Sequence, residues 1–330
     1  MGPARRCRRR PAVRARRETE MGLVERVGGR LAMALLLAAP VAGAQEGEGD
    51  VVYVPTPQHV VEEMLELAKV GPADSLVDLG SGDGRIVITA AKKHGARGLG
   101  VDLDRYLLKL ANDNARKEGV ADRARFLEQN LFETDLSAAT VITTYLLPEM
   151  NQKLQPKFLA LRPGTRIVAH DYDFDSNWTP DARKVMDAPG KTVGEPGKSY
   201  IFLYVVPARI AGEWRSQVRH GRATVPYEFR FDQEFQFVEG MARAGRREAK
   251  IPEFRLEGDR LEFTARLNVR GRVVDHRFAG NVKGGVIAGT LAIGQGAALH
   301  QQPWTAQLVK AGEMSDGTGR PPRQYRHLKQ

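Results

Sequence analysis

One stretch of the sequence decides how the rest is interpreted: Ser75-Leu76-Val77-Asp78-Leu79-Gly80-Ser81-Gly82-Asp83-Gly84-Arg85-Ile86-Val87. An apolar run comes first, three glycines follow at alternate positions, and an apolar segment with helical periodicity comes last. This order predicts a strand, a tight turn and a helix. Glycines let a backbone bend sharply and let a ligand approach it closely, and a helix N-terminus offers free N–H groups. We therefore expect a ligand site at Gly80, Ser81, Gly82, Asp83 and Gly84.

The spacing of this stretch indicates which ligand it binds. A dinucleotide site has the pattern G-x-G-x-x-G, but Arg85 stands where the third glycine would be. The pattern is instead D-x-G-x-G-x-G, with Asp78 in front. A carboxylate there repels a pyrophosphate and suits a ligand that carries an ammonium group. S-adenosylmethionine, with its amino-acid end and its sulfonium, meets that requirement.

The pattern resembles motif I of the class I, seven-strand S-adenosylmethionine-dependent methyltransferases. The alternative is a glycine-rich turn without a ligand. A second signal favours the resemblance, because the next expected strand begins at Arg97 and ends at Asp102. In nucleotide-binding α/β folds an acid at this place accepts hydrogen bonds from ribose hydroxyls. We expect Asp102 and the adjacent Leu103 to bind the cofactor.

A narrower resemblance includes Val54-Pro55-Thr56 ahead of a helix, together with Asp78–Val87. These residues resemble the mitochondrial protein-lysine methyltransferases that modify the ATP synthase c-ring protein and the adenine nucleotide translocase, and their bacterial relatives. The resemblance covers about residues 51–206. It implies N-methylation of a protein lysine or another amine, and it implies that Tyr53, Pro55 and Thr56 fold over the methionine end of the cofactor. The alternative for that segment is a proline-rich linker.

Two further regions contribute candidate site residues. Asn130 and Leu131 follow the third expected strand, where related enzymes place an acid against the adenine amino group; the Asn130 carbonyl can accept the same hydrogen bond. A helix cap is the alternative for Asn130. Tyr145 ends the fourth expected strand, at the edge where open α/β sheets bind ligands. It is the candidate for positioning the acceptor, and a buried tyrosine without function is the alternative.

Strand and helix signals alternate from residue 60 to residue 206. Such alternation predicts a parallel sheet with right-handed crossovers. A helix is expected over about Val60–Lys69, with Thr56 as its cap. Four residues separate the last two expected strands, around Lys191–Gly194 and Ser199–Val206, which is hairpin spacing. We therefore expect residues 45–206 to form an α/β, Rossmann-like, seven-strand methyltransferase sheet.

The pattern changes at Pro207 to short runs of alternating apolar and polar residues. It predicts an additional C-terminal antiparallel β domain over residues 207–310, a small barrel or sandwich. Its alternate aromatics are expected in the core, with Trp214 and Trp304 packing near its two ends. Residues 311–330 are polar, with Pro321-Pro322 and scattered basic residues. We expect a disordered tail there.

The basic charge of the chain is concentrated in residues 1–44. Ten arginines and three glutamates there give +7 of the net +10, so we expect no nucleic-acid partner. Arg26 and Arg30 precede the apolar run Leu31–Ala39, and Ala42-Gly43-Ala44 follows. This order predicts a secretory signal peptide and export to the periplasm or cell envelope. The alternative is a cytoplasmic enzyme tethered by the apolar run, which is short for a membrane span.

These observations predict an S-adenosylmethionine-dependent methyltransferase that acts on a protein lysine or a small amine. The alternatives are a small-molecule methyltransferase and an inactive cell-envelope binding protein that acts through its β domain. We expect no metal site, because His170 with Asp171, Asp173 and Asp175 lacks the glycine and the distal glutamate of a calcium loop. The sequence does not indicate an oligomeric state.

Overall fold

The computed structural model describes residues 52–174, 178–269, 271–294 and 299–318. The predicted leader and signal peptide, residues 1–44, lie outside these ranges, as do residues 319–330. Within the described ranges no helix has both the length and the apolar character that crossing a membrane requires.

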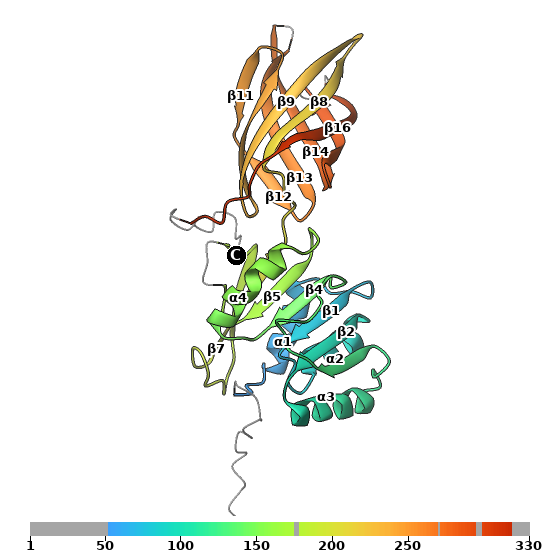
Figure 1. The fold of residues 1–330 in the computed structure, drawn as a ribbon, viewed down its shortest axis with the longest axis vertical. Helices are drawn as coiled ribbons and strands as arrows, with labels where there is room; N and C mark the ends of the chain where they lie inside the picture. Colours follow the sequence, from blue (N-terminus) through green and yellow to red (C-terminus); the bar gives the residue numbers. More distant parts are fainter. Residues whose placement is uncertain (1–51, 175–177, 270, 295–298, 319–330) are drawn as a thin grey trace, which may run out of the picture. The chain divides into compact units, whose positions relative to one another are not determined.

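Sheet A contains seven strands in the order β3-β2-β1-β4-β5-β7-β6 (Figure 1). The five strands β1 to β5 pair in parallel, whereas β7 is antiparallel to both of its neighbours. This is the predicted seven-strand methyltransferase sheet with an antiparallel final strand. The strands are β1 Ser75–Leu79, β2 Arg97–Asp102, β3 Ala124–Glu128, β4 Val141–Thr144, β5 Arg166–His170, β6 Ala182–Asp187 and β7 Lys198–Val205.

Helices cover both faces of sheet A. The helices α1 Gln58–Leu67, α2 Arg85–His94 and α3 Arg105–Lys117 share one apolar core, and α4 Pro148–Leu159 belongs to a second. Successive residues of one strand supply the two cores, since Leu76 lies in the first and Val77 in the second. Side chains that alternate in this way are buried on both faces, which explains the continuous apolar character of β1.

The expected strand around Lys191–Gly194 is wrong. The antiparallel partner of β7 is β6, Ala182–Asp187, and residues 191–194 lie in the loop between them. Gly190 and Gly194 have positive φ angles of 83° and 73°, which a regular strand does not accommodate. The Lys191 side chain is bound in an ion pair described below.

Sheet B, the predicted β domain, contains nine antiparallel strands in the order β11-β10-β9-β8-β16-β15-β14-β13-β12. Its first and last strands along the chain, β8 and β16, pair with each other. Trp214 on β8 and Trp304 on β16 are buried in its core together with the alternate aromatics, as predicted. The strands are β8 Gly212–His220, β9 Ala223–Glu234, β10 Phe237–Ala244, β11 Arg247–Ile251, β12 Phe254–Glu257, β13 Arg260–Val269, β14 Arg272–Lys283, β15 Val286–Ile293 and β16 His300–Ala311.

The chain continues in an ordered path beyond the predicted start of the tail at residue 311. Strand β16 extends to Ala311, and the N–H of Ser315 donates to the carbonyl of Gln233 at 2.8 Å. The part of the predicted tail that the structure describes, residues 311–318, is therefore attached to sheet B.

Candidate functional site

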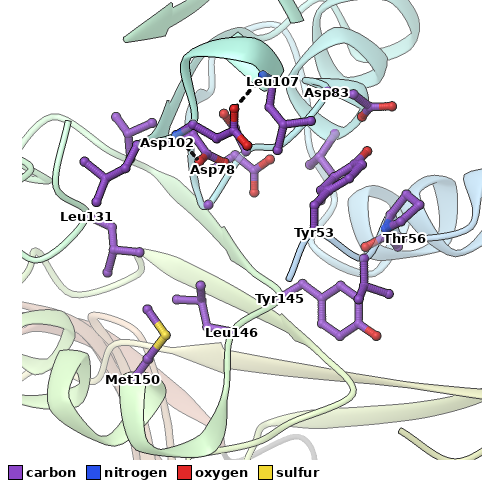
Figure 2. Close-up of a pocket in the computed structure, with 18 of the residues that line it drawn as sticks. Tyr53, Thr56, Asp78, Asp83, Asp102, Leu107, Leu131, Tyr145, Leu146 and Met150 are labelled. Carbon is purple, nitrogen blue, oxygen red and sulfur yellow. Dashed lines mark hydrogen bonds between the residues drawn. The ribbon is translucent and has the colours of Figure 1, made fainter. Parts of the chain in front are cut away.

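A cavity of about 260 Å³ lies at the carboxyl ends of β1, β2 and β4 (Figure 2). This is the edge at which open α/β sheets bind ligands. Eleven of the fourteen residues expected in the site line it: Tyr53, Pro55, Thr56, Asp78, Gly80, Ser81, Asp83, Asp102, Leu103, Asn130 and Leu131. Tyr145, the expected acceptor-side residue, lines it as well.

Gly82 and Gly84, the two remaining expected residues, contribute to packing and do not line the cavity. A Cβ on Gly82 would lie 2.3 Å from the ring of Tyr53, and one on Gly84 would lie 2.5 Å from the ring of Phe126. Both glycines also have positive φ angles, 52° and 82°. The alternate glycines therefore allow two aromatic rings to pack against the turn between β1 and α2.

Asp78 places a buried carboxylate beside the cavity. Its side chain is 1% exposed, and Thr143 donates to Oδ1 at 2.7 Å. Burial raises the pKa of Asp78 to about 7, and the nearby carboxylates of Asp102 and Asp83 act in the same direction. A ligand ammonium next to Asp78 would favour the charged form. The donor set at this point therefore fits the amino-acid end of S-adenosylmethionine.

Asp102 and Asp104 follow one another at the end of β2 but have different partners. Asp102 accepts hydrogen bonds from the N–H of Gly82 at 2.8 Å and from the N–H of Asp104 at 3.0 Å. Asp104 caps α3 by accepting from the N–H groups of Tyr106 and Leu107 at 2.8 and 3.1 Å. The cap is the role predicted for Asp104 from the sequence.

The segment Val52–Thr56 forms one wall of the cavity, as the resemblance implied. Arg85 joins it to the glycine-rich turn, because Nη1 donates to the carbonyl of Thr56 at 2.8 Å and Nη2 pairs with Asp83 at 2.6 Å. Thr56 does not cap α1 as expected; Pro57 is the N-cap residue. The Thr56 hydroxyl instead contacts Nδ1 of His170 at 3.0 Å. It thereby fastens the segment to the end of β5.

Tyr145 and His170 form the other wall and its support. Their ring centroids are 4.1 Å apart, and Nε2 of His170 contacts the hydroxyl of Ser199 at 3.0 Å. Burial, helped by the charge of Lys191, lowers the pKa of His170 to about 4, so this histidine is neutral at physiological pH. Figure 2 shows the Tyr145 hydroxyl pointing away from Asp78 and Asp102.

The third wall follows β3. Asn130 lines the cavity, but its side-chain oxygen accepts from the N–H of Phe132 at 2.9 Å, as in the capping alternative. Sequence reasoning missed several apolar lining residues, because nothing in the local pattern separates them from core residues: Leu107, Phe132, Leu146 and Met150. These side chains supply apolar surface around the acidic groups.

Comparison with known proteins agrees with this geometry. The model of the ANTKMT methyltransferase domain family matches residues 78–182. A protein-lysine N-methyltransferase of Saccharolobus islandicus is 46% identical over 159 residues, which cover 47% of this chain and 94% of that protein. The chain belongs to the protein-lysine N-methyltransferase family.

Other similar proteins match the same share of the chain. The human lysine N-methyltransferase that is named for the c-ring protein of ATP synthase is 32% identical over 156 residues, or 47% of this chain and 66% of that protein. A crystal structure of an RNA methyltransferase from Salinibacter ruber with S-adenosyl-L-homocysteine is 49% identical. That match covers 48% of this chain and 96% of the other, with a TM-score of 0.42.

Family membership confirms the resemblance predicted from the sequence. This member of the protein-lysine N-methyltransferase family is an S-adenosylmethionine-dependent methyltransferase. Asp78 and Asp102 are the side chains suited to the two polar ends of that cofactor, and the segment Val52–Thr56 closes one side of the cavity.

Proposed function

We propose that the chain methylates the side-chain amine of a lysine in a protein acceptor. The observation that carries this proposal is the 46% identity to a protein-lysine N-methyltransferase over 94% of that relative's length. The cavity supports it, because Tyr145 presents an aromatic side chain next to a site that holds two carboxylates. An aromatic face attracts a cationic amine before it reacts.

Bound S-adenosylmethionine supplies a methyl carbon activated by the sulfonium. The residues of the chain exclude water from this carbon and align the acceptor with it, since in-line displacement depends mainly on alignment. The acceptor amine reacts in its neutral form, with its lone pair free. The apolar side chains of Leu146 and Met150 in the cavity wall lower the local polarity. Low polarity favours the uncharged amine.

The test is to incubate the full chain with S-adenosylmethionine labelled on its methyl group and a bacterial cell-envelope fraction. We expect label in a protein band and methylated lysine after acid hydrolysis. Gly82→Val, which places a branched side chain against the Tyr53 ring, is the inactive control. Label found only in small molecules would instead identify a metabolite methyltransferase. Cofactor binding without any transfer would identify the binding-protein alternative.

We also propose that residues 1–44 direct export of the protein to the periplasm or cell envelope. The order of Arg26 and Arg30, an apolar run and Ala42-Gly43-Ala44 supports this. Fractionation of cells that express the full chain, with N-terminal sequencing, tests it. A mature protein that begins at Gln45 outside the cytoplasm is the expected result. An uncleaved protein in the cytoplasmic or inner-membrane fraction would support tethering.

A further inference from the structure

Asp171, the first residue after β5, has an unusual backbone conformation. Its φ angle is 62°, a value that side chains other than glycine rarely adopt. Such conformations cost free energy and persist only where the surroundings fix them. Strand β7 does so here, because the N–H of Asp171 donates to the carbonyl of Tyr200 at 2.7 Å. The N–H of Tyr200 in turn donates to Oδ1 of Asp171 at 3.2 Å.

Asp171 also forms a buried ion pair with the loop between β6 and β7. Nζ of Lys191 lies 2.8 Å from its Oδ2, and the two side chains are only 3% and 2% exposed. The same Nζ donates to the carbonyl of Lys198 at 2.5 Å and to that of Glu195 at 3.3 Å. A Cβ on Gly194 would lie 3.2 Å from both charged groups, so the loop closes tightly around the pair.

A buried ion pair contributes little net stability, because desolvation of the two charges offsets their attraction. The position of this pair indicates another role. Oδ1 of Asp171 lies 3.5 Å from Nε2 of His170, whose ring packs on Tyr145. Burial and the adjacent Asp171 carboxylate raise the pKa of Tyr145 well above its usual range. The carboxylate is therefore near the hydroxyl of Tyr145, while the ring of Tyr145 lines the cavity.

We propose that the Asp171–Lys191 pair positions Tyr145, with the carboxylate holding the tyrosine hydroxyl so that the ring presents a fixed surface to the acceptor amine. This inference rests on the proposed function and goes beyond it by assigning the acceptor side of the site. Lys191 fixes the carboxylate, and the left-handed conformation of Asp171 directs it back toward the end of β4. Asp171 and Lys191 are not among the residues that line the cavity, so we assign them as positioning residues.

The exposed ion pair of Lys198 and Asp187 gives a matched control, because it lies on the same hairpin. In the full chain we expect Asp171→Asn and Lys191→Met to lower kcat/KM for the acceptor about tenfold, the loss expected for one hydrogen bond to a charged group. The Kd for S-adenosylmethionine should stay at the wild-type value. Lys198→Met and Asp187→Asn should behave like wild type in both measurements.

A double-mutant cycle separates positioning from a general loss of structure. If Asp171 acts through the hydroxyl of Tyr145, Asp171→Asn should cost little more in the Tyr145→Phe background, where that hydroxyl is absent. Additive losses in kcat/KM would overturn the inference. So would wild-type kinetics in Asp171→Asn. Asp171→Asn keeps the size of the side chain, so the test stands even if Lys191→Met fails to fold.

A spectroscopic measurement distinguishes failure of this inference from failure of the proposed function. The chain is labelled with 3-fluorotyrosine, and the fluorine signal of Tyr145 is assigned as the one absent in Tyr145→Phe. We expect this signal to shift in Asp171→Asn and Lys191→Met but not in Lys198→Met. An unchanged signal in both would overturn the positioning role. A shifted signal in a chain that methylates no lysine would support the positioning role and overturn the proposed function.

Discussion

The backbone N–H of Gly82 donates to Oδ2 of Asp102 at 2.8 Å, so the glycine-rich turn and the end of β2 are joined directly. Asp102 also accepts from the N–H of Asp104 at 3.0 Å through its other oxygen. A carboxylate has about four acceptor positions, so two remain for a ligand. One side chain thus holds the turn in shape and faces the cavity with acceptor capacity to spare.

We predict that Asp102→Ala weakens binding of S-adenosylmethionine by at least about tenfold, since hydrogen bonds to a charged group are worth about 1.5–3 kcal/mol each. The sequence alone predicts an unchanged fold. Because Asp102 also accepts from Gly82, the structure adds the expectation of a lower Tm. Calorimetric titration and thermal melts measure the two effects.

Asp104→Ala is the control for this prediction. Asp104 caps α3 through two backbone N–H groups, and losing such a cap costs about 1 kcal/mol of stability. We expect a lower Tm with little change in cofactor affinity. If Asp102→Ala binds S-adenosylmethionine like the wild type, the ribose assignment is wrong.

Gly82→Ala tests whether the packing of Tyr53 on the turn is needed for binding. The added Cβ would lie 2.3 Å from the Tyr53 ring, so the ring and the segment Val52–Thr56 must move. We expect weaker cofactor binding and a lower Tm. Gly119→Ala carries a similar backbone strain, with φ of 69°, but its Cβ meets nothing within 4 Å. It should lower the Tm only; equal effects of the two variants on Kd would contradict the prediction.

The local features of sheet A could be predicted from the sequence because they depend on neighbouring residues. The strand before Gly80, the acid at Asp102 and the cap at Asp104 all follow from short patterns. The alternating aromatics of sheet B likewise predicted its core. Each of these features is fixed by periodicity or by backbone chemistry within a few residues.

The features that failed depend on contacts between distant residues. Thr56 has the composition of a helix cap, but its partner is His170, 114 residues away. Lys191 stands among residues that were expected to form a strand, but its side chain is drawn into a loop by Asp171. The positive φ of Asp171 has no signature in the sequence, because the strain is compensated by β7 and not by a local pattern.

Thr56→Val should detach the segment Val52–Thr56 from β5. The substitution keeps the size of the buried side chain but leaves Nδ1 of His170 without its partner at 3.0 Å, and such a loss costs about 1–3 kcal/mol. We expect a lower Tm and a higher Kd for S-adenosylmethionine. Ser199→Ala removes the opposite hydrogen bond of the same imidazole, also at 3.0 Å, without touching this segment. It should lower the Tm alone, and an equal rise in Kd would argue against closure by this segment.

The raised pKa of Asp78 predicts that cofactor binding depends on pH. In the free protein burial raises this pKa to about 7, so much of Asp78 is protonated below neutrality. A ligand ammonium requires the ionised carboxylate and lowers the pKa again, so binding releases a proton. We therefore expect the affinity for S-adenosylmethionine to fall about tenfold between pH 7 and pH 5.5. Calorimetry in two buffers with different ionisation enthalpies counts the released protons.

The same shift has the opposite consequence for the ligand-free protein. Because the folded pKa of Asp78 lies above its unfolded value of about 3.9, its contribution to stability is complete below that value and is lost as pH rises through about 7. S-adenosylmethionine should therefore raise the Tm more at pH 7 than at pH 5.5. In Asp78→Asn, where no carboxylate titrates, proton release on binding and the pH dependence of the affinity over this range should both disappear. If Asp78→Asn releases as many protons as the wild type, Asp78 is not the group that meets the ammonium.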